Sequence, residues 1–194
     1  MPGWSRGRRT CSERAEPEPP PGSARGQTGS HRTPSIPGMS SQREGGCACG
    51  AVRYRLASEP MFIHCCHCLN CQRQTGSAFV INLLIEGDRV ELLGKAPNPI
   101  DAPRDAGPPQ RIFRCPDCQV AVFSQYSRPE VYFVRAGTLD VTSGVTPDVH
   151  IYVRSKLPWV TIPPRTPAFD VYYEPRRLWS AESLRRFQAA RGSA

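Results

Sequence analysis

The sequence predicts an all-β domain built from short antiparallel strands, and three observations lead to this prediction. Hydrophobic and polar residues alternate along the chain, as Val52, Tyr54 and Leu56 do with the arginines between them, which is typical of a half-buried strand. The apolar stretches are short, and turn-forming residues separate them. No long segment with helical periodicity lies between the stretches, so we expect the strands to pair through short connections.

Candidate strands follow one another along most of the chain. They are Val52–Leu56, Met61–Cys65, Ala78–Glu86, Arg89–Leu93, Gln110–Arg114, Val120–Gln125, Val131–Ala136, Val149–Val153 and Phe169–Tyr173. The pair Gly87–Asp88, between two apolar runs, indicates a hairpin turn. Residues 96–109 are rich in proline, aspartate and glycine and predict a long connection. A short C-terminal helix is expected after Ser180 as its N-cap, with Leu184 and Phe187 one turn apart.

The chain is expected to form one folded domain with a segment on either side. Residues 1–43 contain a proline-rich run and almost no apolar residue, which predicts a disordered tail. The folded domain would span residues 44–175, and residues 176–194 would form a helical extension. Met39 stands just before the domain, so it is a candidate for the true initiator, with an over-extended start before it.

Composition argues against an integral membrane protein and against a fully disordered chain. Of the 194 residues, 39% are hydrophobic and 22% are charged. The longest apolar run, Phe79–Ile85, is interrupted by Asn82 and is too short to span a bilayer. The formal charge is +8, but the basic residues are scattered, so nucleic-acid binding is not expected. Because no apolar stretch follows the N-terminal arginines, we expect no secretory signal and a cytoplasmic location.

Eight of the nine cysteines fall into three clusters, and the two outer clusters are pairs. In a reducing cytosol such clusters are more often metal sites than disulfides. Cys47 and Cys49 stand two apart, so an extended chain turns both thiols to one face. Cys115 and Cys118 have the C-x-x-C spacing of a zinc-binding turn. Together the two pairs predict a closed, structural Zn²⁺ site that joins an early strand to one in the middle of the chain.

The middle cluster offers Cys66, Cys68 and Cys71, and no further cysteine pair remains to complete a fourth position. Three protein ligands and an open position are typical of a catalytic zinc, which can bind a thiol and lower its pKa or polarise a carbonyl. Alternatively, Cys65 or His67 supplies the fourth ligand, and both metal sites are structural. Either residue would be out of phase with the other three ligands in an extended segment.

Four segments of the chain resemble the family of glutathione-dependent formaldehyde-activating enzymes and centromere protein V. These segments are Cys47–Tyr54, Cys66–Phe79, Phe113–Cys118 and Ser155–Trp159, and the resemblance covers about residues 44 to 175. It implies a β-tent fold that binds two Zn²⁺ ions. The four outer cysteines would hold the structural ion, and the middle three would hold the catalytic one. Gln119 stands after Cys118 where the family usually has glycine, so we expect a mildly strained left-handed conformation there.

The resemblance implies the activity of a carbon–sulfur lyase. The founding activity of the family adds glutathione to formaldehyde, which gives S-hydroxymethylglutathione. We therefore expect a zinc-dependent enzyme that forms or breaks an adduct between a small, glutathione-like thiol and an aldehyde. Arg73 is a candidate for holding a carboxylate of the thiol substrate. The alternative is a non-catalytic, zinc-stabilised module that binds protein or nucleic acid, as in the centromeric relatives.

Overall fold

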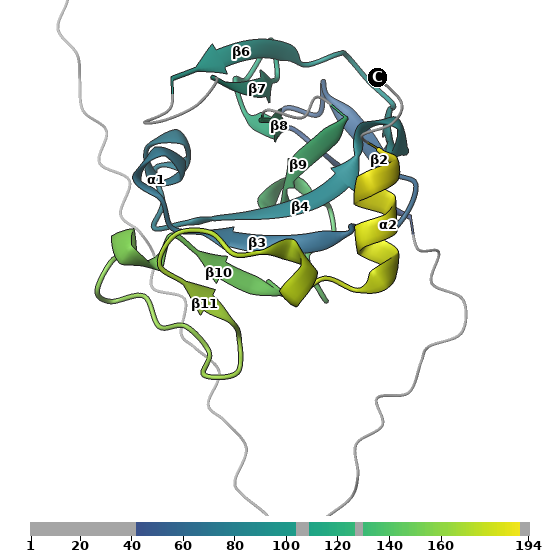
Figure 1. Ribbon diagram of the computed structural model, residues 1–194. Helices are drawn as coiled ribbons and strands as arrows, with labels where there is room; N and C mark the ends of the chain where they lie inside the picture. The colour runs from purple at the N-terminus through teal and green to yellow at the C-terminus, as the bar shows by residue number, and fades with distance from the viewer. Residues whose placement is uncertain (1–41, 104–108, 127–129, 191–194) are drawn as a thin grey trace, which may run out of the picture. The chain divides into compact units, whose positions relative to one another are not determined.

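The computed structural model describes residues 42–103, 109–126 and 130–190, and within these ranges it consists mainly of strands (Figure 1). The strands are β1 (Arg43–Gly46), β2 (Arg53–Leu56), β3 (Phe62–Cys66), β4 (Val80–Glu86), β5 (Val90–Leu92), β6 (Asn98–Ala102), β7 (Gln110–Arg114), β8 (Ala121–Gln125), β9 (Val131–Arg135), β10 (Val149–Ile151) and β11 (Ala168–Phe169). The α-helices described are α1 (Leu69–Thr75) and α2 (Ala181–Ala189). The mainly-β class and the C-terminal helix are thus confirmed. The predicted tail, residues 1–43, lies outside the described residues except for its last two.

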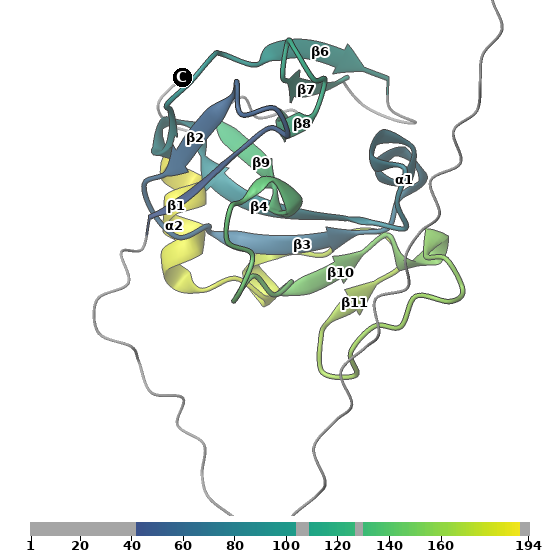
Figure 2. The same cartoon turned by 180° about the vertical axis from the view of Figure 1, so that it is seen from behind.

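The strands form two sheets. The smaller sheet has the order β1-β2-β5, and the larger has the order β11-β10-β3-β4-β9-β8-β7-β6. Most neighbouring strands are antiparallel, as expected, but β10 lies parallel to both β3 and β11. The purely antiparallel prediction is therefore wrong at this edge, where residues 136–148 carry the chain from β9 across to β10. Figure 1 shows β3, β4 and β10 side by side, with α1 near one end of β3 and β4 and α2 near the other. Figure 2 shows the same fold from behind, with β1 and β2 in view.

Two features of the connections differ from the prediction. The residues Gly87–Arg89 form a short 3₁₀ turn and not a hairpin, and β5 pairs with β2 in the smaller sheet instead of with β4. The predicted connection 96–109 contains β6, an edge strand that pairs with β7. Most side chains of β6 are exposed and one residue is Pro99, so the strand lacks the alternating hydrophobic pattern that would predict it.

The two faces of β4 belong to two separate hydrophobic cores. Leu83 packs into the first core with side chains of the smaller sheet, whereas Leu84 packs into the second core with the C-terminal segment. This division follows from the alternation of side chains along a strand. Each core includes two of the clustered cysteines: Cys47 and Cys115 in the first, and Cys66 and Cys71 in the second. The two cysteine clusters are therefore held by different cores.

Helix α2 is fixed to the rest of the domain by packing and by an ion pair between Arg186 of the helix and Glu86 of β4. Leu184 and Phe187 pack against the second core. Ser180 caps the helix by accepting a hydrogen bond from the N–H of Ser183 at 3.0 Å. Helix α2 is short, and within the described ranges no helix combines the length and the hydrophobicity that crossing a membrane requires.

Candidate metal centres

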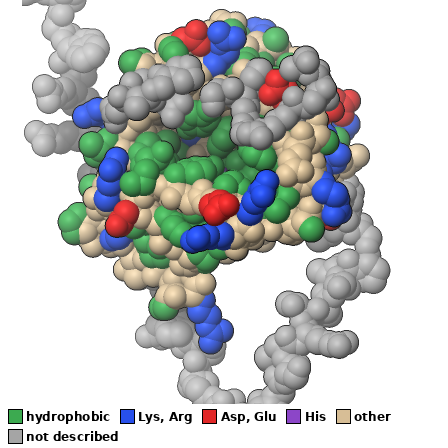
Figure 3. All heavy atoms as spheres, in the orientation of Figure 1, with side chains coloured by type: hydrophobic (Ala, Val, Ile, Leu, Met, Phe, Trp, Pro, Cys, Tyr) green, Lys and Arg blue, Asp and Glu red, His purple; other side chains and the backbone are tan. Residues whose placement is uncertain are grey.

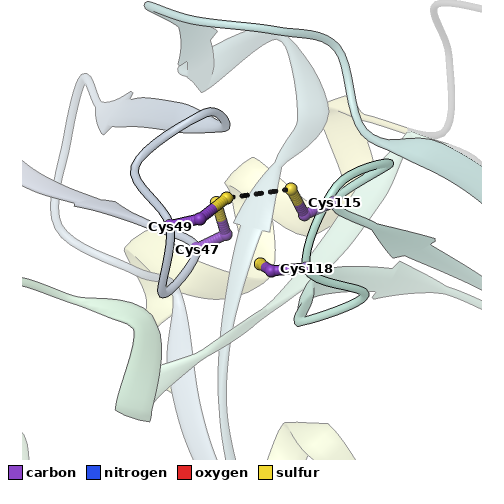
Figure 4. Close-up of side chains that lie close together, drawn as sticks. All are labelled: Cys47, Cys49, Cys115 and Cys118. Carbon is purple, nitrogen blue, oxygen red and sulfur yellow. Dashed lines mark hydrogen bonds between the residues drawn. The ribbon is translucent and has the colours of Figure 1, made fainter.

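The outer cysteine cluster brings together two loops from different sheets. Cys47 directly follows β1, and Cys115 directly follows β7. The sulfur atoms of Cys47, Cys49, Cys115 and Cys118 all lie within 4.8 Å of one another. Figure 4 shows the four side chains meeting from the two loops. All four cysteines are free thiols, so the cluster is not a pair of disulfides.

The geometry of the outer cluster fits a Zn²⁺ ion. The sulfur of Cys49 lies 3.4 Å from that of Cys47 and 3.7 Å from that of Cys115, the latter drawn as the dashed line in Figure 4. A tetrahedron with zinc–sulfur bonds of about 2.3 Å has edges of about 3.8 Å. Burial raises the pKa of Cys47, but the N–H of Val52, which donates to its sulfur at 3.3 Å, and the neighbouring thiols lower it to about 6. A readily formed thiolate within a tetrahedral spacing suits the metal.

The turn that carries Cys115 and Cys118 contains the left-handed residue that the sequence predicts. Gln119 has a φ of 61°. Its N–H donates to the carbonyl oxygen of Cys115 at 3.0 Å, and its side-chain Nε2 donates to the carbonyl oxygen of Pro116 at 3.0 Å. The turn is therefore closed by hydrogen bonds even though a side chain occupies a conformation that favours glycine.

The middle cluster lies where β3 passes into α1. Cys66 ends β3, Cys68 is the N-cap of α1, and Cys71 lies inside this helix. The sulfur of Cys68 accepts a hydrogen bond from the N–H of Cys71 at 3.4 Å. The three sulfur atoms lie within 4.8 Å of one another, because the first turn of the helix brings Cys71 back towards the end of the strand. Gly76 ends the helix with a φ of 63°.

The three thiols of the middle cluster shift the pKa values of one another. Hydrogen bonds from Cys66 and Cys71 lower the pKa of Cys68 to about 2. The hydrogen bonds with Cys68 and Cys71, together with burial, raise the pKa of Cys66. Three thiolates at this separation would repel one another, and a divalent cation would remove the repulsion. Three sulfur donors fit a Zn²⁺ ion that keeps one coordination position open.

A third group forms on the opposite face of β3. His150 on β10 is in register with Cys65 on β3, and His67 stacks on His150 with ring centroids 5.2 Å apart. Nε2 of His67 lies 3.6 Å from the sulfur of Cys65 and 2.9 Å from Nδ1 of His150. All three side chains are buried. The structure therefore groups Cys65 and His67 with His150 and not with the middle cluster, for which they are the alternative fourth ligands.

A buried arginine, which the sequence analysis does not single out, contributes to the electrostatics of the middle cluster. Arg135 on β9 is 6% exposed, and its Nε has no hydrogen-bond partner among the described residues. The pKa of Cys71 is lowered by its hydrogen bond with Cys66 but raised to about 11 overall by Cys68 and by burial, and the charge of Arg135 opposes this rise. The positive charge of Arg135 therefore favours thiolates in the cluster.

A cavity of about 860 Å³ opens beside the middle cluster. Cys66 and Cys68 lie in its wall, together with residues of β4, β9, β10 and the C-terminal segment. Figure 3 shows a hollow on this face with mostly hydrophobic side chains around it. The four cysteines of the outer cluster are not among the described residues that line the cavity. Of the two cysteine clusters, the middle one thus adjoins, among the described residues, a space that could hold a small molecule.

Comparison with known proteins gives similarities over the same region. The sequence profile of a family described as "Glutathione-dependent formaldehyde-activating enzyme" matches residues 42–155, which is more than half of the chain. A protein of Halomonas elongata named "Putative glutathione-dependent formaldehyde-activating enzyme" is 32% identical over 129 residues, which cover 63% of this chain and 82% of that protein. A crystal structure of a Rhodobacter sphaeroides protein is 21% identical, with a TM-score of 0.39, and covers 54% of this chain and 91% of that one.

Proposed function

Since this chain belongs to the family of glutathione-dependent formaldehyde-activating enzymes, we propose that it is a zinc-dependent carbon–sulfur lyase, which joins a small thiol to an aldehyde or splits such an adduct. The proposal includes two Zn²⁺ ions per chain. Cys47, Cys49, Cys115 and Cys118 would hold the structural ion, and Cys66, Cys68 and Cys71 would hold the catalytic one.

The difference between the two cysteine clusters is the observation that carries this proposal. The outer cluster offers four sulfur atoms with nearly tetrahedral spacing, as a closed structural site requires. The middle cluster offers three sulfur atoms, and two of its cysteines line the cavity. A site with an open position and a space beside it supports catalysis, because a substrate can approach the metal from the cavity.

The proposed reaction transfers no electrons to or from an outside group. The sulfur of the thiol donates an electron pair to the carbonyl carbon, and a carbon–sulfur bond forms. The π electrons of the carbonyl move to its oxygen, which takes up the proton that the thiol has lost, and the reverse sequence splits the adduct. A Zn²⁺ ion held by Cys66, Cys68 and Cys71 would supply an open position that lowers the pKa of a thiol.

The residues of this chain would assist the reaction through charge and through exclusion of water. Three thiolates around a divalent cation carry a net charge of −1, and the buried cation of Arg135 offsets it. The hydrophobic wall of the cavity would keep water away from the aldehyde carbon.

The proposal is tested by the exchange of formaldehyde with thiols in the presence of the zinc-loaded chain. Carbon-13 NMR of labelled formaldehyde follows the interconversion of the free aldehyde and its thiol adduct. We expect the chain to accelerate this exchange, and Cys68→Ser to abolish the acceleration. Cys65→Ser is the matched control, because Cys65 is buried next to the cluster in sequence but belongs to the group on the other face of β3. If the chain accelerated the exchange of formaldehyde with no thiol of a panel, a zinc-stabilised binding module would be the better interpretation.

A further inference from the structure

The cavity beside the middle cluster is lined mainly by hydrophobic side chains that come from several elements. They include Leu84, Val131, Phe133, Ile151, Tyr172 and Phe187. The volume of about 860 Å³ falls in the usual range for sites that enclose a small organic molecule. A molecule that fills this space would gain most of its affinity by removing apolar surface from water.

Three polar side chains in the wall are already engaged within the protein. Nε2 of His64 is hydrogen-bonded to the hydroxyl of Tyr173 at 2.6 Å. The amide oxygen of Asn82 accepts a hydrogen bond from Arg135 at 2.6 Å. The hydroxyl of Tyr126 accepts one from Nε2 of Gln110 at 2.9 Å. These three side chains therefore have less hydrogen-bonding capacity left for a strongly polar ligand.

Apart from the two cysteines of the middle cluster, Arg154 is the one charged side chain among the described residues that line the cavity. It is exposed, and it forms no ion pair with a carboxylate of the described residues. The short 3₁₀ turn Val153–Ser155 that carries it follows Tyr152, whose φ of 57° is rare for a residue with a side chain. This left-handed residue and the turn bring Tyr152 and Arg154 to the same cavity.

We infer, on the basis of the proposed function, that the thiol substrate has a hydrophobic body and a single carboxylate, with the body against the apolar wall and the carboxylate at Arg154. Glutathione has two carboxylates and an ammonium group at neutral pH. The described lining residues offer one cation and no acidic side chain for these three charges. A charged group that leaves water without a partner loses affinity, whereas a hydrophobic body gains it.

The inference is tested by the binding of three thiols to the full chain loaded with Co²⁺ in place of Zn²⁺. Coordination of a thiol sulfur changes the visible absorption of Co²⁺, which gives a dissociation constant without any turnover. The probes are 2-mercapto-3-phenylpropanoate, 2-phenylethanethiol and glutathione. We expect 2-mercapto-3-phenylpropanoate to bind at least about tenfold more tightly than glutathione. Arg154→Gln should weaken its binding about fivefold and leave that of 2-phenylethanethiol unchanged.

Arg73, the other candidate for holding the carboxylate, lies on α1 and is not among the described residues that line the cavity. Arg165→Gln is the matched control for Arg154→Gln. Arg165 is also exposed and lies in the same connection between β10 and β11, but it is not among the described residues that line the cavity. It should not change the affinity for any of the three thiols. Binding of glutathione as tight as that of the hydrophobic thiols would overturn the inference and leave the proposed function standing. A spectrum that none of the three thiols changes would overturn the proposed function itself.

Discussion

Arg135 on β9 donates a hydrogen bond from Nη1 to the side-chain oxygen of Asn82 on β4, over 2.6 Å. The two residues face each other in register, and both side chains are buried. Asn82 is the polar residue that interrupts the hydrophobic run Phe79–Ile85. A buried cation without a carboxylate partner is unfavourable unless another negative group compensates it. The thiolates of the middle cluster can provide that compensation, and Asn82 holds the guanidinium in place.

Replacement of Arg135 by methionine should lower the affinity of the middle cluster for zinc. Methionine keeps much of the side-chain volume but removes the charge that favours thiolates. We expect about a tenfold loss of zinc affinity at this cluster, as for other residues that support metal ligands from outside the coordination shell. Transfer of zinc to a coloured chelator measures this loss. We expect two phases, a fast one from the middle cluster and a slow one from the closed outer cluster, so the two sites can be told apart.

Arg111→Met is the control for Arg135→Met. Arg111 on β7 is exposed and pairs with Asp101, so its loss should leave both phases of zinc transfer unchanged. If Arg135→Met accelerated both phases equally, or neither, the charge of Arg135 would have no specific role at the middle cluster.

Serine substitutions in the two clusters should affect folding to very different degrees. Cys115 is completely buried in the first core, and its cluster joins the loop after β1 to the turn after β7. Cys115→Ser should therefore lower the free energy of unfolding by about 3 kcal/mol or more, because metal binding and folding are coupled at a structural site. Cys68→Ser should cost about 1 kcal/mol or less, since serine is itself a favoured N-cap for α1.

Urea unfolding of both zinc-loaded variants measures this asymmetry. Equal destabilisation by Cys115→Ser and Cys68→Ser would mean that the middle cluster is also structural. That result would weaken the proposed function directly, because a structural middle site would have no open position for a thiol.

Sequence periodicity predicts the strands that have one buried face, and it fails where that face is missing. β2 alternates between buried and half-buried side chains, and the pattern is visible in the residues themselves. β6 lies at the edge of the larger sheet with mostly exposed side chains and contains a proline, so it resembles a loop. Helix α1 has only seven residues, too few for a helical period to stand out next to the cysteines.

The candidate site is predictable only in the part that depends on local spacing. Cys66, Cys68 and Cys71 are close in sequence, so their grouping follows from the spacing alone. The contact of Cys65 with His150 depends on the parallel pairing of β10 with β3, which no local pattern indicates. The role of Arg135 cannot be predicted from local spacing either. Arg135 ends a hydrophobic strand, and its contact with Asn82 depends on the pairing of β4 with β9, which are far apart in the sequence.

Replacement of Gln119 by glycine should stabilise the protein. Gln119 has a φ of 61° in the turn between Cys118 and β8, a conformation that costs a residue with a side chain about 1 kcal/mol more than glycine. Gln119→Gly should raise the free energy of unfolding by up to about this amount, as measured by urea unfolding of the zinc-loaded chain.

Gln119→Ala separates the backbone effect from the loss of the side-chain hydrogen bond to Pro116. Alanine keeps the strained backbone and removes the hydrogen bond, so it should be slightly less stable than the natural chain. Should glycine and alanine destabilise equally, the hydrogen bond and not the backbone conformation would determine the stability of the turn.

The ion pair between Glu86 on β4 and Arg186 on α2 fixes the C-terminal helix. Nε and Nη2 of Arg186 donate to the two carboxylate oxygens at 2.7 Å and 2.6 Å, and both side chains are largely buried. Burial raises the pKa of Glu86, but the hydrogen bonds from Arg186 and the charges of Arg186 and Arg89 outweigh it. The pKa of the folded state is therefore lowered from its ordinary value of 4.5.

Glu86→Gln should remove a stabilisation that depends on pH. Because the pKa of Glu86 is lower in the folded state, its contribution is complete above about pH 4.5 and is lost as the pH falls through the folded-state pKa. We expect the variant to be about 2 kcal/mol less stable at pH 7, with a difference that shrinks below pH 4.5. Urea unfolding at several pH values measures this, and Glu91→Gln, at an exposed pair with Arg55, is the control. A difference that stayed constant down to pH 3 would show that the carboxylate charge does not fix the helix.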